Sequence, residues 1–306
     1  MVNKILDYFK IKNKNKFKKN FFVFCMLIIP ILNLLIFYFY VNFNSIIMAF
    51  QRNNHGQIEW SLYNFQKLFE EIGMSNSIIW QSLKNTLIFF FVGFAIINPL
   101  SLLFAYFFFK KIKGYKIFRY IFFLPSIISG AVLVTLYKYM IAPDGVIAVI
   151  MMKLFNTPVP TFLTDSRYAL ITIIIYVIWT GFGVNMILFS GAMKRIPQEI
   201  IDSAKIDGVS MARELFSIVI PMIWPTISSV ILFAVVGIFT ASGPILLFTK
   251  GDSNTYTISY WIFEQVNDTK NYEYASAVGL FFSVLGLPIV LGIKKLLNKL
   301  DGGVEY

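Results

Sequence analysis

The chain has 306 residues, and its 27 lysines and arginines against 16 aspartates and glutamates give a formal net charge of +11. Hydrophobic residues make up 57% of the chain and charged residues only 14%. A soluble domain needs far more polar surface than this, so the composition excludes a soluble domain and indicates a protein of the lipid bilayer.

Six apolar runs are long enough to cross a membrane, because a hydrocarbon layer about 30 Å thick requires roughly 20 apolar residues per helix. They are residues 21–42, 83–109, 118–142, 169–193, 218–249 and 274–293. No small-x-small cleavage pattern follows the first run, so we expect a retained helix there and not a signal peptide. The sequence predicts an all-α membrane protein with six transmembrane helices. Its predicted parts are a basic arm at 1–20, a transmembrane domain at 21–296 and a tail at 297–306.

The basic residues gather in segments that lie on the same side of the membrane if the six runs all cross it. These segments are the arm, residues 110–119, residues 194–213 and the tail. By the positive-inside rule, both termini and these loops are predicted to be cytoplasmic. This topology and contact with anionic membrane lipid account for the net charge, so no nucleic-acid partner is predicted. His55, the single histidine, has no clustered partners, so no metal site is predicted.

A charged segment at residues 196–217 separates the fourth and fifth runs and is predicted to contain two short helices. Pro197 suits the first position of a helix, and Gly208 is predicted to end that helix with a positive φ. Ser210 can cap the second helix. Helices this short are not stable alone, so another surface must pack on them.

Three groups of residues in and after this segment keep a recognisable spacing: Asp202-Ser203-Ala204, Asp207-Gly208-Val209 and Ile218-Val219-Ile220-Pro221. The pattern resembles the EAA motif of binding-protein-dependent ABC importer permeases of the maltose type, which carry oligosaccharides and related solutes. That motif reads Glu-Ala-Ala, Asp-Gly-Ala and Ile-x-Leu-Pro, and the departures here are conservative in chemical kind. The resemblance also includes Trp179-Thr-Gly-Phe and covers the chain from about residue 43 to the last run. One family element, Thr-x-Gly-Gly-Pro, reads Thr249-Lys-Gly-Asp-Ser here.

The resemblance implies a permease subunit in a bacterial plasma membrane. Its implied partners are a second homologous permease, two cytoplasmic ATPase subunits and an external solute-binding protein. The residues that it implies for coupling to the ATPases are Glu199, Asp202, Ser203, Ala204, Asp207, Gly208 and Phe216. The two aspartates are expected to be contact charges and Gly208 the turn. The expected packing face consists of Ile200, Ala204 and Phe216, since Ile196, Ile200 and Ala204 recur at helical spacing.

Catalytic motifs are absent from the sequence. There is no Gly-x-x-x-x-Gly-Lys-Ser/Thr phosphate loop, no Gly-x-Ser-x-Gly elbow and no His-Glu-x-x-His pair. We therefore predict that the chain is not an enzyme, needs no cofactor and leaves ATP hydrolysis to partner subunits. An ion-coupled secondary transporter normally buries ionisable residues near the bilayer midplane, and none lies well inside a predicted span. The sequence thus favours an importer that is driven by separate ATPases over this alternative.

Polar and aromatic residues in the fourth and fifth runs are candidates for a substrate path: Tyr176, Trp179, Asn185, Thr240, Ala241 and Ser242. One interpretation is interhelical hydrogen bonding and close packing. The other is a cavity in which an aromatic ring stacks on a sugar and polar groups bind its hydroxyls. In the family that the chain resembles, the corresponding part of the fifth span lines the cavity, which favours Thr240 and Ala241. An oligosaccharide is the expected solute, with glycerol phosphate esters or another solute as the alternative.

Overall fold

The computed structural model describes residues 2–54, 57–157, 160–240 and 242–300, and most of them are helical. The chain forms two compact units, Met1–Phe65 with Tyr272–Leu280, and Gln66–Asn271 with Phe281–Tyr306. Helix α16 (Tyr272–Leu300) contributes to both units. His55 and Ala241 lie outside the described residues, as do positions 301–306 of the predicted tail.

The first unit begins with a helical stretch that matches the first predicted span. It consists of α1 (Val2–Asn33), a π-helical segment (Leu34–Tyr40) and α2 (Val41–Ala49). Its part Lys18–Ala49 is long and apolar enough to cross a membrane. Because α1 runs through residue 20 without a break, the predicted boundary between arm and span is not a break in the helix.

A small antiparallel hairpin follows α2, in a segment for which the sequence predicted no strand. Its strands are β1 (Gln51–Asn54) and β2 (Gln57–Trp60), paired from Gln51↔Trp60 to Asn54↔Gln57. The side-chain amide of Asn64, in α3 (Tyr63–Gly73), donates to the Gln51 carbonyl at 2.8 Å and to the Ala49 carbonyl at 3.2 Å. These bonds join the start of α3 to the hairpin.

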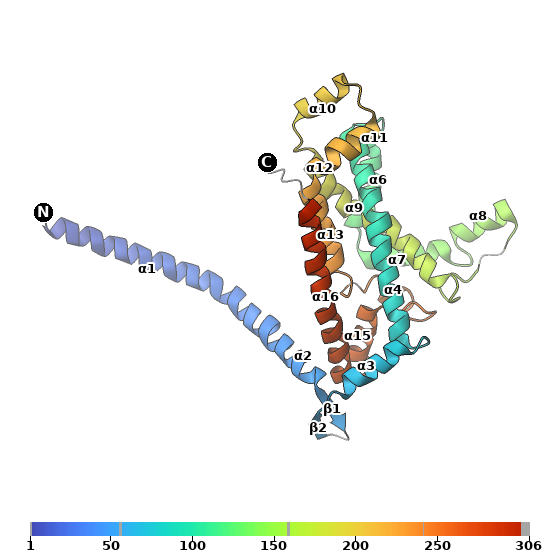
Figure 1. The fold of residues 1–306 in the computed structure, drawn as a ribbon, viewed down its shortest axis with the longest axis horizontal. Helices are drawn as coiled ribbons and strands as arrows, with labels where there is room; N and C mark the ends of the chain where they lie inside the picture. Colours follow the sequence, from blue (N-terminus) through green and yellow to red (C-terminus); the bar gives the residue numbers. More distant parts are fainter. Residues whose placement is uncertain (1, 55–56, 158–159, 241, 301–306) are drawn as a thin grey trace. The chain divides into compact units, whose positions relative to one another are not determined.

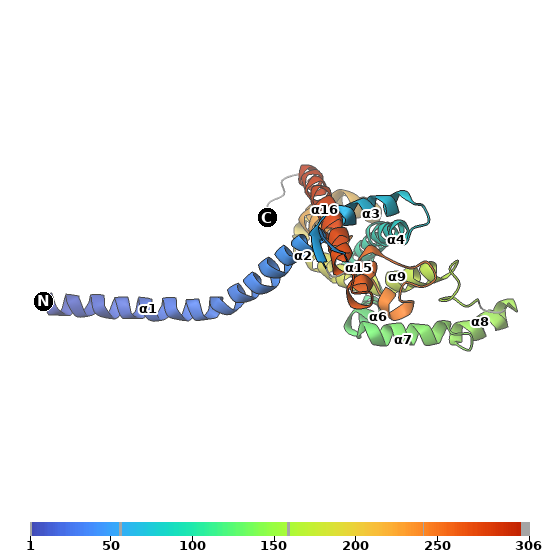
Figure 2. The same cartoon turned by 90° about the horizontal axis from the view of Figure 1, so that it is seen from below.

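The second unit is a bundle in which α9 (Ala169–Met193) packs against α5 (Asn98–Phe109) and α6 (Tyr115–Ile127). Helices α6 and α9 are labelled in both views (Figure 1, Figure 2). Helix α5 continues α4 (Ile78–Val92) through a π-helical segment (Gly93–Ile97). The remaining helices are α7 (Gly130–Ile141), α8 (Val146–Phe155), α10 (Gln198–Ile206), α11 (Met211–Glu214), α12 (Ile220–Met222), α13 (Trp224–Val236), α14 (Ile245–Phe248) and α15 (Ile258–Asn267). A third π-helical segment, Leu215–Val219, joins α11 to α12.

The prediction of an all-α membrane protein is confirmed, because the described residues contain five helices able to cross a membrane, or six if one bent pair counts as a span. Two predicted spans differ from the structure in detail. The third predicted run, 118–142, is interrupted because Ile128 is extended, with φ −78° and ψ 142°. The fifth run, 218–249, bends by 76° between Met222 and Trp224. Pro225 stands in the first turn of α13, and its ring and missing N–H prevent a straight continuation from the preceding helix.

The loop at residues 249–255, where the sequence departs from the Thr-x-Gly-Gly-Pro pattern, is a well-defined turn. The hydroxyls of Thr249 and Thr255 lie 2.6 Å apart and are buried. The side-chain amide of Asn85 in α4 donates to the carbonyls of Asn254 and Tyr256, each at 2.8 Å. The turn is therefore fixed to α4 by side-chain hydrogen bonds.

Candidate functional site

Helix α10 stands at the end of the second unit, with α11 and the start of α6 nearby (Figure 1). The backbone of Pro197 is extended, with ψ 131°, and the helix begins at the next residue, one position later than predicted. Ile201 and Ala204 are buried, as is Ile196 just before the helix. Ile196 and Ile201 belong to an apolar cluster that also contains residues of α5, α9 and α13. This cluster anchors α10 to the bundle.

Of the three residues of the predicted packing face, only Ala204 is buried within this chain. Ala204 is buried as expected, but Ile200 is 37% exposed and Phe216 is 68% exposed, while Ile201 packs inward. The reason is that Ile196 lies before the extended Pro197 and is outside the helical register, so its position does not predict the phase of Ile200. Ile200 and Phe216 are thus apolar side chains without a covering surface from the described residues of this chain.

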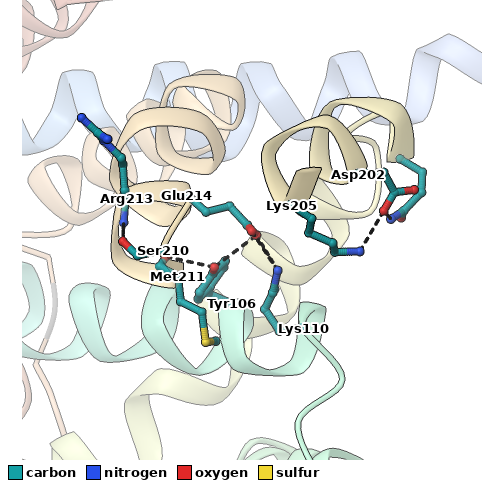
Figure 3. Close-up of polar contacts among 9 residues, drawn as sticks. Tyr106, Lys110, Asp202, Lys205, Ser210, Met211, Arg213 and Glu214 are labelled. Carbon is teal, nitrogen blue, oxygen red and sulfur yellow. Dashed lines mark hydrogen bonds and ion pairs between the residues drawn. The ribbon is translucent and has the colours of Figure 1, made fainter. Parts of the chain in front are cut away.

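The outer face of α10 carries charge. Glu199, Asp202, Ser203 and Asp207 are all exposed. The Asp202 carboxylate accepts hydrogen bonds from Lys205 at 2.8 Å and from Gln198 at 3.1 Å, and Figure 3 shows the contact with Lys205. These two bonds, that from Lys205 first, hold the pKa of Asp202 below its ordinary value, so the side chain is anionic at neutral pH.

Gly208 ends α10 as predicted. Its φ is +68°, its N–H donates to the Lys205 carbonyl at 3.1 Å, and the Val209 N–H donates to the Ala204 carbonyl at 3.0 Å. This pair of bonds is the Schellman arrangement, in which glycine supplies the left-handed residue. A Cβ at Gly208 would meet no atom within 4 Å. The left-handed backbone conformation, and not a lack of space, is therefore what favours glycine here.

The second short helix, α11, is capped as predicted by Ser210, whose hydroxyl accepts a hydrogen bond from the Arg213 N–H at 3.4 Å. Four residues later lies Glu214, which is only 2% exposed. Its carboxylate accepts bonds from the Lys110 ammonium at 2.8 and 2.9 Å and from the Tyr106 hydroxyl at 3.1 Å (Figure 3). Tyr106 and Lys110 belong to the end of α5 and the residue after it, so this network joins α5 to α11.

Sequence reasoning did not find the network of Tyr106, Lys110 and Glu214. The available signal was positional, since Lys110 directly follows one apolar run, 83–109, and Glu214 lies four residues before the start of another, 218–249. A charge at such a boundary is either solvated or paired, and the sequence alone does not say which. A buried pair holds its two elements in a strict geometry, because separating the charges in a low-dielectric environment is costly.

The α9 residues predicted for a substrate path take different roles. Tyr176 is buried, and its ring centroid lies 4.9 Å from that of Phe248 and 5.3 Å from that of Tyr137. This is a packed aromatic cluster, which favours the packing interpretation for Tyr176. Trp179 lies at the edge of the cluster, 6.3 Å from Tyr137, with 37% of its surface exposed.

The remaining candidates for the substrate path also differ in their contacts and exposure. The side-chain amide of Asn185 donates to the Asn98 side-chain oxygen at 2.8 Å, an interhelical bond between α9 and α5. Thr240 is exposed after α13, and its carbonyl accepts a hydrogen bond from the Ser259 hydroxyl at 3.0 Å. Ser242 is half-buried. Trp179 and Thr240 therefore keep exposed surface, whereas Tyr176 and Asn185 bond or pack within the chain.

Comparison with known proteins gives consistent matches. The family model described as binding-protein-dependent transport system inner membrane component matches residues 97–300. The lactose transport system permease protein LacF of Rhizobium radiobacter is 30% identical over 212 residues, which are 67% of this chain and 71% of that protein. The probable ABC transporter permease protein YesP of Bacillus subtilis (strain 168) is 27% identical over 222 residues, 71% of this chain and 72% of that protein.

A solved structure matches over nearly the whole chain. It is the crystal structure of a bacterial ABC transporter involved in the import of the acidic polysaccharide alginate. One chain of that structure has a TM-score of 0.81 and 25% sequence identity, with 93% of this chain and 98% of that chain covered.

Proposed function

This chain belongs to the family of inner membrane components of binding-protein-dependent transport systems, and from this premise we propose that it is a permease subunit of an ATP-driven importer for an oligosaccharide or another sugar. The observation that carries the proposal is the family match over residues 97–300, which contains α10 and α11. The relatives named for lactose and alginate transport support a sugar as the solute.

The proposed partners are a second homologous permease, two cytoplasmic ATPases and an external solute-binding protein. The exposed outer face of α10 supports contact with an ATPase, because Asp202 and Asp207 present charge there and Ile200 and Phe216 present uncovered apolar surface. A movement of an ATPase would displace α10 and, with it, the adjoining α11. The buried Lys110–Glu214 pair joins α11 to the end of α5 and would move α5 as well, so that the spans alternate between inward-open and outward-open states.

The proposed function is tested by reversing the charge of Asp202 in the purified importer, reconstituted with its ATPases and binding protein. We expect Asp202→Lys to abolish solute-stimulated ATP hydrolysis while the complex still assembles, because in the proposed contact the Asp202 carboxylate faces a basic residue of an ATPase, which the new cation would repel. An acidic substitution of that basic residue should restore part of the activity.

The matched control is Asp268→Lys, which reverses an exposed aspartate directly after α15, at the other end of the same unit (Figure 1). This control should keep wild-type stimulation. Wild-type stimulation in Asp202→Lys would remove α10 from the coupling contact.

A second prediction concerns the proposed solute path. We expect Thr240→Leu to reduce solute uptake without reducing assembly, because the larger side chain fills exposed space and removes a hydroxyl. The measurement is uptake of radiolabelled sugar into proteoliposomes. Thr240→Ser, which keeps the hydroxyl, should retain most of the uptake, and unchanged kinetics in Thr240→Leu would assign Thr240 to packing.

A third prediction concerns orientation. We propose that both termini and the α10 segment are cytoplasmic, because the basic residues concentrate in the arm and in the loops around residues 110–119 and 194–213. Reporters fused after Tyr306 or inserted within residues 110–119 should give a cytoplasmic signal. A reporter near Asn54 should give an external one, and a cytoplasmic signal at Asn54 would contradict the proposed topology.

A further inference from the structure

A strongly basic cavity lies beside α10. Its volume is about 570 Å³, and it is formed by the end of α5, the start of α6, the end of α9 and α10 itself. Five cationic side chains line it: Lys110, Lys111, Arg119, Lys194 and Lys205. The cavity thus collects positive charge from two stretches that are far apart in the sequence, residues 108–119 and residues 190–205.

The charges of this cavity are only partly neutralised within the chain. Lys110 pairs with Glu214 at 2.8 Å, and Lys205 pairs with Asp202 at 2.8 Å. Lys111, Arg119 and Lys194 form no ion pair with any residue in the part of the chain that the structure describes. Three cations therefore remain for an external anion.

An apolar groove adjoins the basic cavity. It has a volume of about 320 Å³ and lies between α5 and α6, where its walls include Phe104, Phe107 and Phe118. Phe108 and Tyr115 line both the groove and the basic cavity, so the two spaces share a border. The combination is amphipathic, with a cationic end and a hydrocarbon-like end.

The location of this combined site fits the boundary of a membrane. Lys110 directly follows the candidate span Ile78–Phe109, and Lys194 directly follows the candidate span Ala169–Met193. Lipid headgroups lie at such boundaries, and basic pockets between transmembrane helices bind anionic headgroups. The apolar groove is lined by Phe104 and Phe107 of α5. These residues precede Lys110 and so lie on the hydrocarbon side of this boundary, where acyl chains lie.

We propose that this site binds one anionic phospholipid, with its phosphate in the basic cavity and an acyl chain in the groove between α5 and α6. A free phosphate or an acidic peptide would use the cavity alone, and the adjoining groove is what selects a lipid. Because Gln198, Ile201 and Lys205 of α10 line the cavity, the bound headgroup stabilises the position of α10. Assignment to the cytoplasmic leaflet rests on the proposed orientation, whereas binding itself does not.

The test measures phosphatidylglycerol binding to the whole assembled importer by native mass spectrometry, with phosphatidylcholine as the neutral comparison. The double variant Arg119→Gln/Lys194→Gln removes two unpaired cations of the cavity. Each cation near an anionic surface contributes roughly a fivefold gain in affinity, so the variant should bind phosphatidylglycerol about 25-fold more weakly. The control Lys116→Gln/Lys295→Gln removes two exposed cations that do not line the cavity and should bind as the wild type does.

Two further measurements distinguish a lipid from other anions. Phe118→Gln makes one wall of the groove polar and should weaken phosphatidylglycerol binding, and excess inorganic phosphate should not displace the lipid. Hydrogen exchange of the α10 amides should slow on addition of phosphatidylglycerol in the wild type and the control, but not in the double variant.

Three results would overturn the proposal. The first is equal phosphatidylglycerol binding by the double variant and its control. The second is displacement by phosphate together with no effect of Phe118→Gln, which would indicate a simple anion site. The third is phosphatidylglycerol binding that appears only after the ATPases are removed, which would assign the cavity to an acidic segment of an ATPase. None of these results bears on solute uptake, so a failure here is distinguishable from a failure of the proposed function.

Discussion

Glu214→Leu should lower the free energy of unfolding by roughly 3–5 kcal/mol, because it leaves the Lys110 ammonium without its buried partner. Lys110 has only 17% of its side chain exposed, and both carboxylate oxygens of Glu214 accept its hydrogen bonds. The Tyr106 hydroxyl would lose its bond to the carboxylate as well. The measurement is thermal or denaturant unfolding of the purified importer in a single detergent.

A double variant separates stability from coupling. Lys110→Met/Glu214→Leu replaces the ion pair by apolar side chains of similar size and should recover most of the lost stability, since such replacements are often neutral or stabilising. If the pair transmits movement from α11 to α5, the double variant should still show weakened solute-stimulated ATP hydrolysis.

The half-exposed pair Lys67–Glu71, at 3.8 Å, provides the control. Glu71→Gln there should change stability by less than about 1 kcal/mol. If Glu214→Leu lowers the free energy of unfolding no more than this control does, the Lys110–Glu214 pair is not a structural connection.

Gly208→Val should abolish solute-stimulated ATP hydrolysis while the subunit remains in the membrane and assembles. At φ +68° a β-branched residue costs about 1–2 kcal/mol or more in backbone strain, and α10 is too short to absorb it without moving. Because Gly208 fixes the direction in which the chain leaves α10, the exposed Asp207 would be displaced with it. The assay is the ATPase rate of the reconstituted complex with and without its binding protein and solute.

Gly208→Asn is the matched control, since asparagine tolerates the left-handed conformation and a Cβ at this position meets no atom within 4 Å. It should keep most of the stimulation. If Gly208→Val also keeps the solute-stimulated ATP hydrolysis, the turn after α10 does not need its observed geometry for coupling. Residues 196–217 then lose their assigned role.

The sequence by itself determined the features that depend on local chemistry. Apolar length predicted runs at 21–42 and 169–193, and the structure has candidate spans at Lys18–Ala49 and Ala169–Met193, because crossing a hydrocarbon layer sets a minimum length for a helix. The left-handed Gly208 and the capping Ser210 were also predictable, since backbone conformation and caps are decided within a few residues.

The tertiary structure decided what depends on distant partners. The pairing of Lys110 with Glu214 joins residues 104 positions apart, and no local pattern specifies which charge finds a partner. The inward phase of Ile201, in place of Ile200, follows from how α10 leaves the extended Pro197 and meets the bundle. The role of Asn185 was likewise decided by the tertiary structure, because its side-chain amide reaches Asn98 of α5 only when α9 and α5 pack together. Side chains in a membrane satisfy their polar groups with whatever the neighbouring helix presents, and that neighbour is chosen by the fold and not by the local sequence.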